Sequence, residues 1–465
     1  MLFSSLTFLY LFIAAIIILY FAVPFKAKNA VLLVFSLFFY AWGGVKYALL
    51  MVLAITLGYV FGLLIEKYRG KTIAKVFTGV AVACIISFML YFKYTDFFIE
   101  NFNAITGLSI PLLKIVLPIG ISFYTFQIIS YVIDVYRGEK AQKNPINLAA
   151  YVAMFPQLIA GPIVRYSDVA RELEHRTHSI TKAAEGVRRF IIGLSKKVLI
   201  ANSMYDLSEI IYAAEEKTVL FYWMYGISIA LYIYFDFSGY SDMAIGLGKI
   251  FGFNFLENFN YPFISKSATE FWRRWHMSLG SWFRDYLYIP LGGNRVPKWR
   301  WLLNIFAVWM FTGFWHGAAW NFIIWGLFFG ILLVIEKFWL LKYLEKSKVI
   351  SRIYILLAVI TSFIVFQISS LGEAFTYIGG LFGAGGIPFS SAETLYYLRS
   401  YAVLLIAALV GSTPLIKKLA TRFSTSEKFG KIANIVEPVM LVVLFAVVTA
   451  FLVDSSSNPF LYFRF

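Results

Sequence analysis

Long apolar stretches recur along almost the whole chain, and they constrain its fold more than any other feature of the sequence. A helix needs about 20 mostly apolar residues to cross the hydrocarbon core of a bilayer. Twelve stretches reach or approach this length, although the second and the eighth are short. They predict an all-α, polytopic membrane protein with roughly 11–12 transmembrane helices, at residues 4–25, 30–44, 47–65, 76–92, 115–134, 190–212, 218–237, 301–316, 318–338, 352–371, 397–415 and 435–453.

The composition excludes an ordinary soluble domain. Hydrophobic residues make up 60% of the chain and charged residues only 14%, whereas soluble domains are about half apolar and about a quarter charged. The net charge of +16 would suggest nucleic acid in a soluble protein, but in a membrane protein Lys and Arg gather in cytoplasmic loops. Cys84 is the only cysteine, so neither an intramolecular disulfide nor a cysteine-based metal site can form.

The charges of successive loops predict which side of the membrane each loop faces. The first stretch has no basic region before it, so we interpret it as a retained helix with the N-terminus outside. Lys26 and Lys28 then lie inside, and the signs alternate consistently along the chain. Glu215 and Glu216 fall outside, Lys417, Lys418, Arg422, Lys428 and Lys431 fall inside, and the C-terminus lies outside.

No soluble domain or long linker interrupts the pattern, so residues 1–465 are predicted to form one membrane-embedded domain with an extracytoplasmic aromatic tail at 454–465. Three stretches differ from simple spans. Residues 154–165 contain two prolines and a glycine, which predicts a re-entrant or in-plane segment that protein or a water-filled cavity must surround. Residues 235–248 are too polar and glycine-rich for a lipid-facing helix, and residues 268–295 predict one amphipathic helix in the inner interface. The loop 372–394 is expected outside, where its length suits a contact surface or lid.

Of the four histidines, His316 is the strongest candidate for chemistry. It lies between two apolar runs near mid-membrane, where an ionisable group is costly and should face a cavity or a partner. The alternative is a core histidine satisfied by a backbone carbonyl. His276, in WRRWHMSLG, is either a second site residue or an interfacial histidine among aromatics. His175 and His178 lie in a charged stretch without further ligands, which favours a solvated loop over a metal site.

A neutral imidazole is the natural general base near pH 7, and it can take the proton of a hydroxyl that attacks a thioester. The sequence has no G-x-S-x-G elbow, P-loop or dinucleotide fingerprint. Asp236 lies in the polar FDFSGYSD stretch, where it is either functional or paired with a nearby arginine. The tail ends in NPFLYFRF, so Tyr462 is either an interfacial anchor or a transient acyl acceptor in the active site.

Several long motifs, in one order and over nearly the full length, resemble the membrane-bound O-acyltransferase (MBOAT) family. The resemblance is greatest to the branch that includes the membrane subunits for alginate and peptidoglycan O-acetylation. It is carried by LFFYAWG, LPIGISFYTFQIISYVIDVYRG, FPQLIAGPIVRY, YFDFSGYSDMAIGLGKIFGF, FWRRWHMSLGSWFRDYLYIPLGGNR, TGFWHGAAWNFIIWG and the aromatic tail.

The resemblance implies a ring of helices with re-entrant and interfacial helices, around a central funnel that opens to both sides and meets near the histidines. It implies His316 as the catalytic residue, His276 as a second site residue and Tyr462 as an acyl carrier. Arg273, Arg274 and Lys298 are expected on the inner face, where they would meet the phosphates of the donor or anionic lipid headgroups. The remaining residues predicted to bind substrate are Trp315, Asn321, Gln127 and Asp236.

The same resemblance implies a multi-pass protein of the bacterial cytoplasmic membrane that uses acetyl-CoA as the acyl donor and no metal. An extracytoplasmic SGNH-type acetyltransferase partner with a Ser-His-Asp site would then acetylate a polysaccharide. Two other functions stay open on the residues alone. Broken helices and buried charges also suit a transporter or a flippase for a lipid-linked or acyl substrate, and the chain would also serve as a non-catalytic scaffold for an extracellular enzyme.

Overall fold

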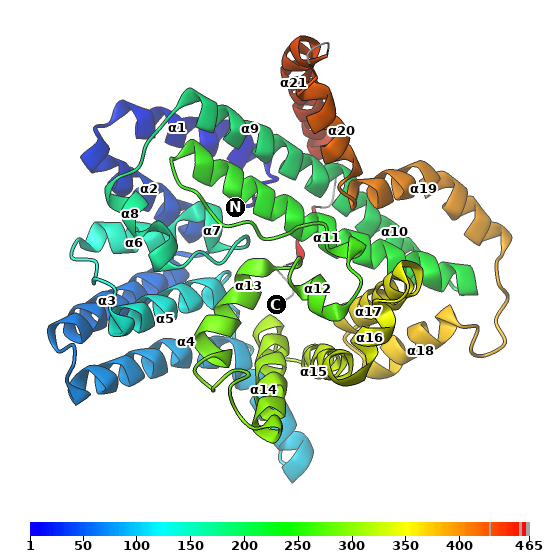
Figure 1. Cartoon of the computed structure of the whole chain (residues 1–465), viewed down its shortest axis with the longest axis horizontal. Coiled ribbons are helices and arrows are strands. Elements are labelled where there is room, and N and C mark those ends of the chain that lie inside the picture. The colour runs from blue at the N-terminus through cyan, green and yellow to red at the C-terminus, as the bar shows by residue number, and fades with distance from the viewer. Residues whose placement is uncertain (427–428, 455–457, 462–465) are drawn as a thin grey trace. The chain divides into compact units, whose positions relative to one another are not determined.

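The computed structural model describes residues 1–426, 429–454 and 458–461, and within these ranges all regular structure is helical (Figure 1). The chain forms two compact units. The first unit comprises Met1–Phe190 and Ser241–Leu256, and the second comprises Ile191–Tyr240 and Glu257–Phe465. That the whole chain acts as one domain stays a prediction, and each unit is described by itself.

The multi-pass, all-α prediction is confirmed. Among the described residues, seven helices are long and apolar enough to cross a membrane: α3 (Val45–Lys67), α4 (Thr72–Thr106), α11 (Val219–Ile250), the continuous helix Trp320–Leu344, α17 (Lys348–Gln367), α19 (Ala392–Gly411) and α21 (Gly430–Asp454). The other five predicted spans also fold as helices, but these are shorter or more polar. Helix length and composition together therefore give seven candidate crossings among the described residues, where the apolar pattern predicts twelve stretches.

The remaining helices of the first unit are η1 (Thr7–Phe12), α1 (Ile13–Ala22), α2 (Phe25–Ala41), α5 (Ile121–Arg137), α6 (Pro145–Ala153), α7 (Phe155–Leu158), α8 (Tyr166–Glu174) and α9 (Ile180–Ser195), of which α9 continues into the second unit. Small residues allow close packing here, as they do in many membrane helices. A Cβ added to Gly62 of α3 would lie 2.5 Å from the hydroxyl oxygen of Tyr131 in α5. Helices α3 and α5 are thus in direct contact, and the side chain of Tyr131 fills the space above Gly62.

Residues 154–165 have an irregular backbone apart from the short helix α7, and residues 154–164 are buried. That the segment is re-entrant or lies in the membrane plane stays a prediction. The backbone groups find protein partners: Ser36 Oγ accepts from the Phe155 N–H at 3.0 Å, and the Tyr151 hydroxyl donates to the Val164 carbonyl at 3.0 Å. Protein therefore surrounds this non-helical backbone, as it must at membrane depth.

The remaining helices of the second unit are η2 (Lys196–Ala201), α10 (Asn202–Ala213), η3 (Pro262–Ile264), α12 (Ala268–Trp272), α13 (Met277–Phe283), η4 (Arg284–Tyr288), α14 (Lys298–His316), α15 (Trp320–Ile335), η5 (Glu336–Leu340), α16 (Leu341–Leu344), α18 (Leu371–Leu381) and α20 (Leu415–Ser424). Helices α9, η2 and α10 follow one another without a break, as do α15, η5 and α16. η2, η4 and η5 are π-helical, a form found frequently at functional sites.

Three predicted features differ in detail from the structure. Residues 235–248 continue α11 as an unbroken helix, and all of them except the half-buried Asp242 are buried inside the protein, so the polar residues avoid lipid without breaking the helix. The predicted single amphipathic helix at 268–295 is wrong, because the chain turns between α12 and α13. The loop predicted at 372–394 is helical through Leu381, since Ser370 caps the start of α18.

Candidate active site

His316 ends α14, and a tight helix pair determines its position. The chain leaves the helix at Gly317 and returns as α15 from Trp320, so α14 and α15 run side by side in the second unit (Figure 1). A Cβ at Gly313 would lie 2.2 Å from the Phe322 carbonyl oxygen, and one at Gly326 would lie 2.3 Å from that of Trp309. Only glycines allow the two backbones to approach this closely, and this contact places the last turn of α14 against α15.

Among the described residues, aromatic side chains that include Trp315, Trp325 and Phe366 surround the imidazole of His316 and form a cage. The ring centroids of Trp315 and Trp325 each lie 5.0 Å away, and that of Phe366 lies 5.4 Å away, all nearly perpendicular to the imidazole plane. Indole and phenyl rings stabilise a nearby cation, and the C-terminal end of a helix carries partial negative charge. Both effects would favour a positive charge on this imidazole.

His276 lies in the turn that separates α12 from α13. Its backbone is left-handed, with φ of 42°, so the chain is not helical at this residue. The side chain is buried. The Nδ1 atom lies 3.0 Å from Asn258 Oδ1. The same oxygen accepts a hydrogen bond from Ser278 Oγ at 2.8 Å and one from the Ser278 backbone N–H at 3.4 Å. The backbone donor identifies this atom as the amide oxygen.

Asn258 therefore determines the tautomer of His276. An amide oxygen only accepts, so Nδ1 carries the proton and Nε2 of the neutral ring keeps its lone pair. His276 lies outside the seven long apolar helices. Burial, together with the neighbouring His316, holds its pKa well below the usual value. The neutral ring thus presents Nε2 as a hydrogen-bond acceptor, and this nitrogen has no hydrogen-bond partner among the described residues.

Trp315 and Phe237 connect the two histidines to the surrounding helices. The His276 ring lies 6.1 Å from the indole of Trp315, which in turn contacts His316. On its other side, Phe237 of α11 packs edge-on against His276 at 4.6 Å. His316 keeps 7% of its surface accessible and His276 only 1%. His316 is thus the more accessible of the two imidazoles.

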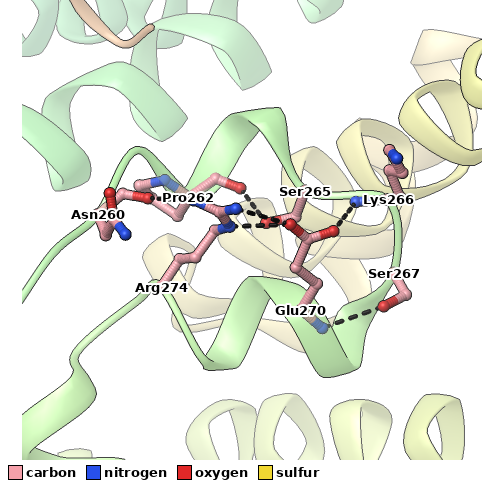
Figure 2. Close-up of polar contacts among 7 residues, drawn as sticks. All are labelled: Asn260, Pro262, Ser265, Lys266, Ser267, Glu270 and Arg274. Carbon is pink, nitrogen blue, oxygen red and sulfur yellow. Dashed lines mark hydrogen bonds and ion pairs between the residues drawn. The ribbon is translucent and has the colours of Figure 1, made fainter. Parts of the chain in front are cut away.

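A polar network supports the turn that carries His276, and Figure 2 shows its centre. Arg274 donates to Glu270 at 2.9 Å and to the Asn260 carbonyl at 3.1 Å, so it ties α12 to the segment that carries Asn258. Ser267 caps α12 by accepting from the Glu270 N–H. The buried Glu336 also accepts from the N–H groups of Ala268 and Thr269. Together these bonds orient both ends of α12 and hence the turn that follows it.

The other predicted site residues have diverse surroundings. Arg273 and Lys298 are exposed, whereas Arg274 has the two protein partners described above. Lys298 begins the helix that His316 ends, and an 18-residue separation corresponds to about 27 Å along a helix. Asn321 donates to the Val365 and Phe366 carbonyls at 3.3 Å, so it supports the cage residue Phe366. Asp236 forms a buried ion pair with Lys197 rather than with an arginine.

Two predicted residues lie apart from this description. Gln127 is buried in α5 of the first unit, and its contribution stays a prediction. Tyr462 lies outside the described residues, which end at Leu461.

In the first unit, His178 bonds to the Tyr20 hydroxyl at 2.9 Å, while His175 is exposed. Within the described ranges, no group of three or more His, Cys, Asp or Glu could hold a metal ion.

Sequence reasoning missed Asn258, Trp325 and Phe366. Asn258 lies in the aromatic stretch NFNYPF, 18 residues before His276, and nothing in its spacing indicates the hydrogen bond. Trp325 lies in a recognised motif, at i+9 from His316, but its contact depends on the turn at Gly317. Phe366 comes from a different helix, α17, and only the packing of the unit brings it to the site.

Comparisons with known proteins show which family the chain resembles. Residues 142–372, which include both histidines, match the model of the membrane-bound O-acyltransferase family. The chain is 40% identical over 418 residues to a probable alginate O-acetylase of Azotobacter vinelandii, covering 88% of this chain and 84% of the relative. It is 37% identical to a probable alginate O-acetylase of Pseudomonas putida over the whole of both chains. It is 33% identical to a peptidoglycan O-acetyltransferase of Helicobacter pylori, covering 83% and 81%.

Proposed function

The chain belongs to the membrane-bound O-acyltransferase family, and from this premise we propose that it transfers an acetyl group from acetyl-CoA toward a polysaccharide outside the cell. The observation that carries the proposal is the aromatic cage around His316, with His276 beside it in the same unit. As a multi-pass O-acyltransferase, the enzyme would work in the bacterial cytoplasmic membrane. The names of its relatives support alginate or peptidoglycan as the class of acceptor.

His316 acts as the general base in this proposal. A hydroxyl oxygen attacks the thioester carbonyl carbon of the donor while His316 accepts the hydroxyl proton. The carbon–sulfur bond then breaks, and the departing thiolate takes the proton from His316, which leaves an ester and free CoA. The cage and the end of α14 stabilise the imidazolium between these two steps. His276 orients the reactants by accepting a hydrogen bond at Nε2.

The first hydroxyl acceptor is that of Tyr462, which would carry the acetyl group briefly. An extracytoplasmic SGNH-type partner would then pass the group to the sugar. The donor must be extended if its phosphates meet Lys298 while its thioester meets His316, because about 27 Å of helix separates the two residues. Arg273 is exposed on the chain near His276 and would contact the same phosphates. Anionic lipid headgroups are the competing partners for these cations.

The test is to replace His316 by Ala in the purified chain and to supply acetyl-CoA with a labelled acetyl group. Loss of a general base lowers the rate about 10²- to 10⁴-fold. We expect free CoA release and protein acylation to fall by this amount, while the variant elutes like the wild type. Acetyl content of the surface polysaccharide in cells should fall in parallel. Wild-type turnover in a stably inserted variant would refute the role of His316.

The same assay separates the enzyme from the transporter and scaffold alternatives. A transporter, flippase or scaffold would bind without breaking the thioester, so neither free CoA nor acylated protein would form in the wild type. Tyr462→Phe removes only the hydroxyl and serves as the matched variant for the carrier step. It should abolish labelling of the chain, whereas a change limited to interfacial anchoring would leave labelling intact.

A further inference from the structure

A buried ion pair in the second unit connects the transmembrane helices to the chain's C-terminal segment. Lys197, in the π-helical turn η2, lies 2.6 Å from Asp236 of α11, and their side chains are 1% and 0% exposed. Taking two charges out of water is costly, and an apolar pair of similar volume is often at least as stable. The presence of this pair therefore points to a task beyond holding two helices together.

Both members of the pair also form hydrogen bonds to the C-terminal segment 458–461. Lys197 donates to Asn202 Oδ1 at 2.8 Å and to the Pro459 carbonyl. With Asp236, these acceptors account for all three donors of the ammonium group. The second oxygen of Asp236 accepts from the Leu461 backbone N–H at 3.1 Å. The cation thus binds a carbonyl of the segment and the anion binds an N–H two residues later.

Apolar contacts hold the same segment. The Phe460 ring lies 5.1 Å from that of Tyr240, and Leu461 belongs to the core cluster that also contains Trp275 and Trp325. Phe460 and Leu461 are 6% and 3% exposed. The segment is therefore bound by both polar and apolar contacts inside the second unit.

The location of the pair relates it to the candidate active site. Asp236 and Phe237 are successive residues of α11: the first binds Leu461, and the second packs against His276 at 4.6 Å. We propose that Lys197 and Asp236 form a clamp that binds the backbone of residues 459–461, and that acyl transfer depends on this binding. The link to transfer rests on the proposed function, whereas the binding of the segment does not.

Accessibility of the segment tests the clamp without any activity measurement. Phe460→Cys in a Cys84→Ala background provides a single thiol, and its rate of reaction with a soluble maleimide reports release of the segment. The variant Lys197→Met with Asp236→Leu removes both charges and keeps an apolar pair. We expect labelling to accelerate about tenfold or more, because hydrogen bonds to charged groups are among the stronger ones. An unchanged rate in the folded variant would overturn the clamp.

A second ion pair between the same helices provides the matched control. Arg189 of α9 and Asp242 of α11 form a partly buried pair at 2.8 Å. Arg189→Gln with Asp242→Asn removes these charges and should leave the labelling rate at position 460 unchanged. Equal acceleration in both double variants would mean that general loosening of the helices, not the clamp, releases the segment, and would also overturn the proposal.

A charge exchange separates the clamp from a structural ion pair. Lys197→Asp with Asp236→Lys keeps one pair of opposite charges but turns an ammonium toward the Leu461 N–H and a carboxylate toward the Pro459 carbonyl. If the pair only holds the two helices together, the exchanged pair should restore the slow labelling of the wild type. If the pair binds the segment, the exchanged charges face the wrong backbone groups and labelling should stay fast. We expect fast labelling at position 460 in this variant, and wild-type labelling would contradict the proposal.

Turnover then tests the link to acyl transfer. The apolar double variant should lower kcat about tenfold or more, since a displaced reacting group is costly, while KM for acetyl-CoA stays at its wild-type value. Fast labelling with normal kcat would refute the dependence of acyl transfer on the clamp and leave the clamp itself standing. Absence of turnover in the wild type would instead refute the proposed function, while the labelling result would still decide whether the segment is clamped.

Discussion

At the scale of single residues, a neutral amide determines the behaviour of His276. Asn258 accepts a hydrogen bond from the Nδ1–H of His276, so Nε2 is left as an acceptor. A carboxylate in the same place would also accept this proton, but it would favour the imidazolium form. The choice of amide therefore keeps the second imidazole neutral where burial already lowers its pKa.

Replacing Asn258 by Asp should move the acidic limb of the pH–rate profile to higher pH. The carboxylate raises the pKa of His276 above its depressed wild-type position. Activity that needs a neutral ring is present above that pKa and is lost as the pH falls through it. The measurement is kcat/KM for acetyl-CoA between pH 5 and about pH 8, the range in which His charge changes normally fall.

Asn258→Leu provides the control for this shift. It removes the acceptor and adds no charge, so both tautomers become available and the ring loses its orientation. We expect kcat to fall about hundredfold, in line with a small misplacement of a site group, without movement of the acidic limb to higher pH. An acidic limb that stays in place in Asn258→Asp would contradict control of His276 by this amide.

At the scale of helices, the position of His316 depends on how closely α14 and α15 approach. Gly313 faces the backbone of α15, and the added Cβ would overlap the Phe322 carbonyl at 2.2 Å. A rigid backbone atom cannot move aside as the end of a side chain can, so the helices themselves would have to separate. The aromatic cage draws its residues from α14, α15 and α17, so separation would open it.

Gly313→Ala should therefore reduce both stability and turnover. Overpacking costs about 1–3 kcal/mol in a well-packed core, and we expect a lower Tm in detergent together with a lower kcat. Gly79→Ala in α4 is the matched control, because nothing lies within 4 Å of its added Cβ. That variant should keep its turnover and gain slightly in helix stability. Equal effects at both positions would show that the α14–α15 contact has no special importance.

The turn at His276 illustrates why helix patterns fail at such a site. Trp272, Trp275 and Leu279 recur at helical spacing, and this regularity predicts one continuous amphipathic helix. The chain instead turns, because Asn258 binds Ser278 and His276 from a segment distant in sequence. Periodicity reports which side chains are apolar, but it contains nothing about a tertiary hydrogen bond that interrupts a helix.

At the scale of the whole molecule, hydropathy predicts most of the helices because the bilayer demands long apolar segments. The motif around His316 likewise identifies the residue but not its surroundings. No sequence pattern marks Lys197, because its proposed role depends on tertiary contacts with Asp236 and Pro459. Membrane sidedness depends on loop charge rather than on packing, so it remains the property of the whole chain that experiment must decide.

The loop charges predict that Glu216 lies outside and Lys418 inside. Both side chains are exposed, the first in the loop between α10 and α11 and the second within α20, so substitution by Cys should disturb little. In a Cys84→Ala background, a membrane-impermeant maleimide applied to intact spheroplasts should label Glu216→Cys and spare Lys418→Cys. Permeabilised cells should show labelling of both variants, which controls for reactivity. The reversed pattern would place the positively charged α20 outside, against the preference of basic loops for the cytoplasm, and would require the acyl donor to enter from the side opposite to the one proposed.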